Sequence, residues 1–236
     1  CTDGHVRVRP APDGRTEIAF TVDAQSIAID DGVANLFADP LRTAVLQRQL
    51  LGRADLDALR LQFALPPAGN SLPFETTLGG QVRLYDLDMT LGSGVDAVVV
   101  NGISGVVTLA DSRIDDLGGQ LRGALRGVTF RLFGQPFENT DATFTADASR
   151  LTISALTMRC HGGVVQSARP DAPGIEYRLP AHDVPDGRLS ADLTFEEVDV
   201  HTFLAESGWT NPPYSGAASG TLRIERLDGN TVLGRS

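Results

Sequence analysis

The chain has 236 residues, of which 42% are hydrophobic, and its formal net charge is -10. It is long enough to bury a substantial core as one large β domain or two small ones. The negative charge argues against a nucleic-acid-binding surface, which needs a clustered basic face. No run of about 18 apolar residues occurs, so nothing in this stretch is predicted to span a membrane, and any anchor must lie outside it.

Alternating apolar and polar side chains, the pattern of a strand with one apolar face, recur along most of the chain. This alternation predicts strands, in chain order, over residues 6–9, 16–29, 59–65, 80–91, 97–110, 120–133, 142–146, 151–159, 164–169, 188–196 and 218–225. Asp13-Gly14 is a hairpin signal between the first two strands. With 25 glycines, 13 prolines and only 6% aromatic residues, turn-rich β structure is favoured over a helical bundle.

Two short helices are predicted among the strands. The first runs from Asp39-Pro40 to Gly52, because Asp39 can cap it, Pro40 suits its first position and the apolar residues that follow are spaced for one face. We expect it to cover one end or face of the sheet. The second is a helical turn over residues 201–207 that ends at Gly208.

Several predicted strands change their apolar face partway along. The phase slips near Asp86, at Asn101-Gly102, at Gly127-Val128 and at Glu196-Glu197. A slip requires a bulge or a sharp bend, so we expect long, strongly twisted strands. Glycine pairs at 79–80, 118–119 and 162–163 lie near strand ends and hint at a degenerate repeat of hairpin units.

Together these patterns predict a mainly β protein, an elongated, twisted antiparallel sheet that forms a groove, with one or two short helices. We interpret residues 1–236 as a single β-rich domain or a segment excised from a longer protein, with a candidate boundary near residues 66–80. Cys1 leaves two interpretations open: it is the lipidated N-terminus of a lipoprotein, or it marks an excision point.

No motif for catalysis, cofactor binding or metal binding occurs in the sequence. There is no serine elbow, no glycine-rich nucleotide loop and no His-Glu-x-x-His pattern, and the four histidines are scattered without ligand spacing. Cys160-His161 could attack a carbonyl or bind a metal, but neighbours on a strand point to opposite faces. His182-Asp183 could be two-thirds of a triad but lacks a serine motif. We therefore predict a non-enzyme with no catalytic residue, no metal and no cofactor.

Two further features have both a functional and a structural interpretation. Asp86 with Asp88, and Glu196 with Glu197, could be the paired carboxylates of a carbohydrate-active enzyme, but they sit at phase slips and suit a solvated edge better. Trp209, with Tyr214 beside prolines, could be a carbohydrate platform or an interfacial anchor, although a lone aromatic residue usually packs on a loop.

The stretch from Gly187 to Gly229 carries an ordered set of short motifs. These are Gly187-Arg-Leu-Ser-Ala-Asp-Leu-Thr-Phe, Val198-Asp199-Val200, Phe203-Leu204, Tyr214-Ser-Gly216 and Ala218-Ser-Gly220-Thr-Leu-Arg-Ile, with weaker support from His161-Gly162-Gly163-Val164. The pattern resembles the C-terminal region of AsmA-like bacterial envelope proteins, which are relatives of TamB, and the best-matching region is 150–229. The resemblance implies a protein anchored in the inner membrane of diderm bacteria, with a β-rich periplasmic groove that serves phospholipid transport or outer-membrane homeostasis.

The apolar positions themselves also favour a groove. They are mostly small and aliphatic, whereas a sandwich needs bulky residues interleaved between its layers. We expect the lining to include Leu189, Leu193, Phe195, Leu222 and Ile224, and Leu193→Glu to abolish lipid uptake with only modest loss of fold. The predicted partner is a phospholipid or another acyl lipid, with no nucleic acid, and the membrane is reached through segments outside this chain. The alternative is a structural or adhesive extracytoplasmic β-scaffold with a sealed core.

Overall fold

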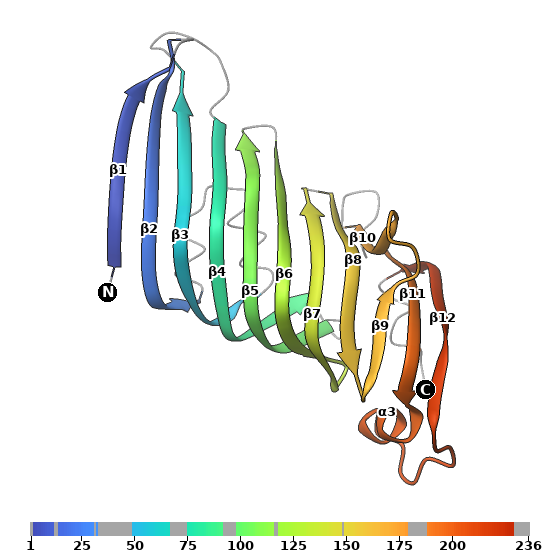
Figure 1. Cartoon of the computed structure of the whole chain (residues 1–236). Coiled ribbons are helices and arrows are strands. Elements are labelled where there is room, and N and C mark those ends of the chain that lie inside the picture. Colours follow the sequence, from blue (N-terminus) through green and yellow to red (C-terminus); the bar gives the residue numbers. More distant parts are fainter. Residues whose placement is uncertain are drawn as a thin grey trace.

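The described part of the protein forms one antiparallel sheet with a short helix at one end (Figure 1). The computed structural model describes residues 2–11, 14–30, 32, 49–66, 75–91, 98–115, 118–147, 149–178 and 188–228. In these residues the strands are β1 (Thr2–Pro10), β2 (Thr16–Ile29), β3 (Leu51–Leu65), β4 (Glu75–Leu91), β5 (Val98–Asp115), β6 (Gly118–Leu132), β7 (Gln135–Ala146), β8 (Arg150–Cys160), β9 (Gly163–Ser167), β10 (Pro173–Arg178), β11 (Arg188–Asp199) and β12 (Ala217–Asp228); the helix is α3 (Val200–Glu206).

The strands follow one another across the sheet almost in chain order, as expected for a succession of hairpins. β9 and β10 share one position, because each pairs with both β8 and β11, and a short excursion over residues 168–172 separates them. Ala64 pairs with Glu75, so the candidate boundary near residues 66–80 lies between, and partly within, two paired strands of one sheet. The prediction of a mainly β, antiparallel fold is confirmed.

Most predicted strands are present and longer than expected, and β2 has the predicted bounds. The predicted helix is wrong at its end, because β3 begins at Leu51 and its first residues pair with β2 and β4. Gln49 and Leu50 are not helical either, and Gln49 has a positive φ of 45°. Residues 39–48 of that helix, Cys1 and Asp13 lie outside the described residues. β10 was not predicted; it is only six residues long and begins with Pro173-Gly174, which read as a break in the sequence.

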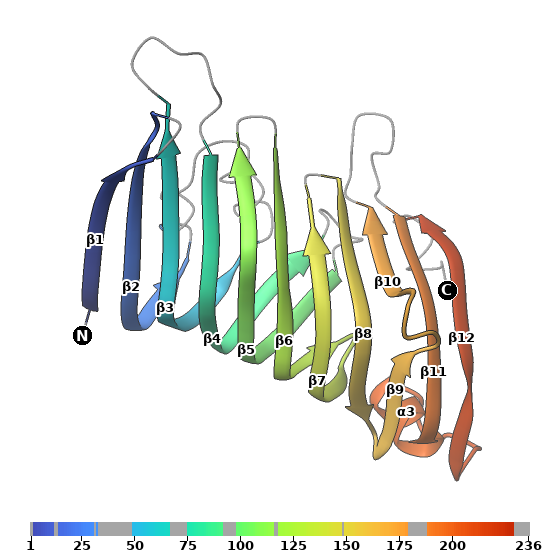
Figure 2. The same ribbon diagram turned by 45° about the horizontal axis from the view of Figure 1, so that its top comes forward.

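The long strands bend at bulges. A residue with positive φ lies within each, at Ser26, Ala58, Asp86, Gly102, Gly127, Asn139, Ala155 and Glu197. The pairing register shifts at the same places. A bulge bends its strand and increases the local twist, and Figure 2 shows the lower ends of β2 to β6 turning away from the upper sheet. The four predicted phase slips are therefore confirmed as bulges.

A side chain on a neighbouring strand satisfies the backbone N–H at most of these bulges. The acceptor is a carboxylate or a hydroxyl oxygen at 2.7–3.0 Å. The donor and acceptor residues are Ser26 and Asp55, Ala58 and Asp23, Asp86 and Ser104, Gly102 and Asp88, Gly127 and Asp141, and Glu197 and Ser219. Because an extra residue in one strand leaves the ladder bond unmade, these side chains stabilise the bends.

Glycine gives two of the bulges the room that they need. A Cβ on Gly80 would lie 2.7 Å from Cα of Leu59, and one on Gly163 would lie 2.5 Å from the backbone nitrogen of Val198. Both glycines therefore allow the bulged neighbour to approach. This is a local reason for the second glycine in the pairs at 79–80 and 162–163.

Candidate functional site

One face of the sheet is apolar across many strands, because the register aligns the apolar positions. Continuous rows of paired residues cross the sheet. One row consists of Ala24, Leu56, Val82, Val107, Leu125 and Ala142, and another of Val6, Phe20, Leu61 and Leu78. Charged residues such as Asp57 and Arg83 alternate with them along the strands and face the other side.

The apolar face lies on the inside of the bends. Beside the bulges its side chains are among the most buried in the described residues: Ala24, Ala54, Leu87, Val100, Val128, Ala142 and Leu156. On the opposite side of the same bends, Gln25, Asp57, Asp86 and Asp141 are exposed. This contrast is expected when both arms of a bent strand cover its inner corner. We call the inner apolar side the concave face.

The concave face is most closely packed in the C-terminal half. Its buried cluster is formed by Ala142, Leu156, Met158, Ala191 and Leu193, with partly buried residues around it, among them Phe130, Phe137, Ile175 and Ile224. The rings of Phe130 and Phe137 stack with centroids 5.1 Å apart. The bulges bring these residues together from β6, β7, β8, β10, β11 and β12.

All five residues predicted to line the groove lie on the concave face. Leu193 pairs with Leu222, and Phe195 pairs with Gly220, on which a Cβ would lie 2.9 Å from the ring of Phe195. Leu189, Phe195 and Ile224 are partly buried. Leu193 is 6% exposed and belongs to the packed cluster, whereas Leu222 is 47% exposed. Leu222 is therefore the accessible member of this pair.

The N-terminal half of the concave face is more open, and the predicted lining did not include it. Val6 and Val8, on the edge strand β1, are each 63% exposed. Next to them, Phe20 and Phe63 meet edge to face with ring centroids 5.6 Å apart. The alternation of these residues was visible in the sequence, but their neighbours across the sheet follow only from the register.

The concave face is long and has no second layer in the described part of the chain. The path across the sheet passes through eleven hydrogen-bonded strands. At about 4.8 Å between strands, ten intervals span roughly 48 Å. α3, the helix with described bounds, packs at the end of β11 and not across the face.

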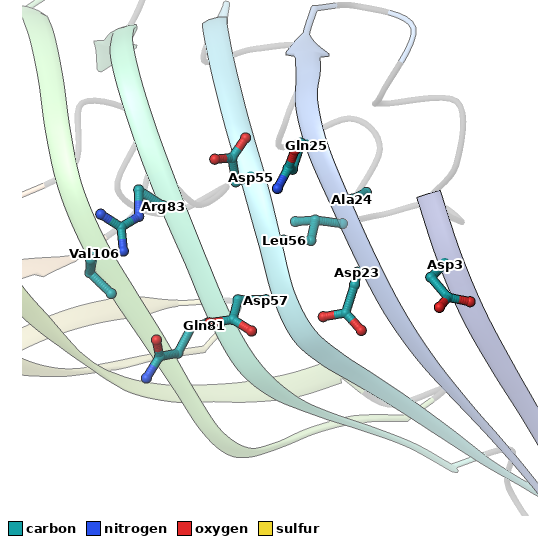
Figure 3. Close-up of a pocket in the computed structure, with 10 residues that line it drawn as sticks. All are labelled: Asp3, Asp23, Ala24, Gln25, Asp55, Leu56, Asp57, Gln81, Arg83 and Val106. Carbon is teal, nitrogen blue, oxygen red and sulfur yellow. The ribbon is translucent and has the colours of Figure 1, made fainter. Parts of the chain in front are cut away.

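A hollow on the opposite, polar face has four aspartates among its ten lining residues. Its volume is about 370 Å³. Figure 3 shows the residues that line it, among them Asp23, Asp55, Asp57 and Arg83. Oδ1 of Asp55 accepts the backbone N–H of Ser26, and Oδ2 accepts the hydroxyl of Tyr85 at 2.6 Å. The hydrogen bond from Tyr85, and then that from Ser26, lowers the pKa of Asp55.

Two of these carboxylates, those of Asp23 and Asp55, have a structural role because they stabilise the bends of β2 and β3. Asp23 accepts the backbone N–H of Ala58, as Asp55 accepts that of Ser26. Within the ranges that the structure describes, no three His, Cys, Asp or Glu side chains are grouped to hold a metal ion.

The side chains of Cys160 and His161 lie in different environments. Burial, and then the negative charge of Glu206, raises the pKa of the buried Cys160 thiol to about 11. The thiol is therefore protonated at neutral pH and is a poor nucleophile or metal ligand. Nε2 of His161 lies 2.5 Å from Oε1 of Gln135, in a contact that links β7 to the turn between β8 and β9.

Residues of both acidic pairs take part in hydrogen bonds at the bulges. Asp88 accepts the N–H of Gly102, and the N–H of Glu197 donates to Ser219. Asp86, Glu196 and Glu197 are exposed, as expected for a solvated edge. His182-Asp183 lies outside the described residues.

The fold and its concave face define a single-layer antiparallel β protein with one apolar side. No protein-family model matches the chain, and no curated protein or solved structure is significantly similar to it. In the described residues, no helix is both long and apolar enough to cross a bilayer.

Proposed function

We propose that this chain holds the acyl chains of phospholipids or other acyl lipids against its concave face. In this proposal it is a non-enzymatic, lipid-handling section of an AsmA-like envelope protein that acts in phospholipid transport or outer-membrane homeostasis. The supporting observation is the continuous apolar row from Ala24 to Ala142, which has no second layer over it in the described part of the chain.

The dimensions and chemistry of the concave face suit hydrocarbon chains. A bilayer core of about 30 Å gives each leaflet roughly 15 Å of acyl chain, so a face of roughly 48 Å has room for several chains end to end. Each methylene sheltered from water contributes about 0.8 kcal/mol. The apolar rows contain no charged side chain, so a polar headgroup would stay at the rim.

The proposed location follows from the same resemblance. The chain would lie in the periplasm, tethered to the inner membrane by a flanking segment, and the lipid would pass along the concave face.

Leu222→Glu tests this proposal more directly than Leu193→Glu does. Because Leu193 is packed in the buried cluster, a glutamate there would bury a charge at a cost of several kcal/mol, and we no longer expect only a modest loss of fold. Leu222 is exposed, so Leu222→Glu introduces a charge at the concave face with little effect on folding. Thr221→Glu places the same charge on the exposed opposite face of β12 and is the matched control.

The experiment is a titration of the protein with a fluorescent fatty acid. We expect wild type and Thr221→Glu to bind it, and Leu222→Glu to bind less of it while unfolding at a similar urea concentration. A scaffold with a sealed core predicts no binding by wild type, and that result would reject the proposal. Equal binding by the two glutamate variants would remove β12 from the binding face.

A further inference from the structure

Exposed aromatic side chains gather around α3. Phe133 is 55% exposed, Phe203 38%, Trp209 56% and Tyr214 61%. They come from the turn between β6 and β7, from α3 itself and from the loop that joins α3 to β12. We call these four residues the aromatic collar. Trp209 and Tyr214 therefore do not have the buried loop packing that is usual for aromatic residues.

Hydrogen bonds hold the helix and its loop together. Asp199 caps α3 by accepting the N–H groups of His201 and Thr202. The loop folds back on the helix, because the N–H of Trp209 donates to the carbonyl of Leu204 at 3.1 Å. At the other end of α3, Nδ1 of His201 lies 3.3 Å from the carbonyl oxygen of Tyr214. Trp209 and Tyr214 are thus fixed near opposite ends of one helix.

The turn that carries Phe133 is attached to the same helix. Nε2 of Gln135 donates to the carbonyl of Phe203 at 3.3 Å and to Oγ of Ser207 at 2.9 Å. Gln135 is buried, and its Oε1 contacts His161. The collar is therefore assembled from segments about 70 residues apart in sequence by a buried polar contact, as expected for a built surface and not for a fraying loop.

The segment that contains α3 and the loop after it carries little charge. Residues 200–216 contain no arginine and a single carboxylate, Glu206, in a chain that is 21% charged overall. Figure 1 shows α3 and the loop after it protruding beyond the lower ends of β9 and β11. An exposed, nearly uncharged group of aromatic residues at a protruding end is a typical interaction surface.

We propose that the aromatic collar is an interfacial anchor that inserts into the headgroup region of a zwitterionic bilayer. This inference rests on the proposed function, because it places the C-terminal end of the concave face at the membrane that supplies or receives the lipid. Tryptophan and tyrosine have an apolar ring and a polar tip, and they concentrate where a membrane meets water. The net charge of -10 disfavours an anionic surface, so zwitterionic lipid is the expected partner.

Trp209 reports directly on this contact, because it is the only tryptophan in the chain. The probe is a phosphatidylcholine vesicle with brominated acyl chains, which quenches an indole that enters the bilayer. We expect the Trp209 emission of the wild type to shift to the blue and to be quenched. In Phe133→Ser/Tyr214→Ser, which keeps the reporter, we expect vesicle affinity to fall about tenfold. Leu51→Ser/Val99→Ser removes exposed apolar side chains elsewhere and is expected to bind as wild type does.

The outcomes separate the anchor from the groove. Absence of a shift or of quenching with the wild type overturns the anchor, and so does equal vesicle affinity of the wild type and Phe133→Ser/Tyr214→Ser. A blue shift that depends on protein concentration and not on vesicles would assign the collar to a contact between two copies and also overturns it. We expect Leu222→Glu to bind less fatty acid than the wild type does but to bind vesicles equally well. If the wild type binds no fatty acid, the proposed function fails, and the vesicle experiment still decides whether the aromatic collar is an anchor.

Discussion

Gly163 faces the carbonyl oxygen of Glu196 so closely that a methyl group on Gly163 would collide with it. The contact joins β9 to the bulge of β11, where Glu197 has a φ of 55°. The close approach of β9 and β11 thus depends on the absence of a side chain at Gly163 and on the extra residue in the β11 bulge. Since bulges of this kind bend the long strands, such contacts shape the concave face.

Gly163→Ala is expected to destabilise the protein by about 1–3 kcal/mol, because the added Cβ meets rigid backbone. Gly4→Ala is the matched control: its Cβ would have 3.7 Å to the carbonyl oxygen of Thr21, so its effect should be small or slightly stabilising. Urea unfolding of the two variants measures the difference. Equal midpoints would show that β9 can shift to accept the methyl group.

Thr140→Val is expected to stabilise the protein by about 1 kcal/mol. Thr140 is 2% exposed, and among the described residues its Oγ1 has no hydrogen-bond partner. A buried hydroxyl without a partner is unfavourable, and valine has nearly the same shape without it. The control is Thr143→Val, which removes a hydroxyl that donates to the carbonyl of Ser154 at 3.2 Å and should not stabilise. A lower urea midpoint for Thr140→Val would contradict this prediction.

Asp55 should make stability depend on pH in the acid range. Its pKa is lowered from 3.8, chiefly by the hydrogen bond from Tyr85. A carboxyl with a lowered pKa in the folded state stabilises the fold above its unfolded pKa, and this contribution is lost as pH falls through the folded pKa. We therefore expect the stability difference between wild type and Tyr85→Phe to be constant above about pH 5 and to shrink below about pH 4.

Urea unfolding of both proteins across this range measures the difference. The comparison with Tyr85→Phe matters because the pKa values of Asp147 and Asp199 are lowered as well, and their contributions to acid unfolding cancel in it. A difference that stays constant to the lowest pH at which both proteins fold would show that the Tyr85 hydrogen bond does not depend on the ionised carboxylate.

Cys160 should react with thiol reagents only slowly in the folded protein. With a pKa of about 11 instead of 9.0, it holds about 100-fold less thiolate near pH 8, and burial further limits access. In a Cys1→Ser background, which leaves one thiol, we expect labelling to be at least 100-fold faster in urea than in buffer. Rapid labelling of the folded protein would mean that this end of the sheet opens readily.

Much of the secondary structure could be predicted because alternation is a local signal. A residue and its second neighbour face the same side of a strand whatever lies beside them. The phase slips located the bulges at Asp86, Gly102, Gly127 and Glu197 for the same reason. The bulge at Ser26 had a weaker signal, a three-residue step from Ala24 to Ile27, and it was missed.

The residues from Leu51 to Ala58 were harder to assign, because the predicted helix was extended to Gly52. Two neighbouring strands override that helical spacing at Leu51 and Gly52, since Gly52 pairs with Ile29 on one side and Leu51 with Asp88 on the other. The local sequence pattern does not show that a segment will pair with residues about 30 positions away. The short strand β10 was missed because its pairing with β8 and β11 makes it a strand in spite of Pro173-Gly174.

The alternation in the sequence by itself determined that the sheet has an apolar side and that Leu193 and Leu222 lie on it. This was possible because the direction of a side chain depends on backbone geometry within a few residues. It could not show that Leu193 is packed while Leu222 is open, nor that a single row joins Ala24 to Ala142. Those features arise from register and from bends added up over many strands, and both depend on contacts between residues far apart in the chain.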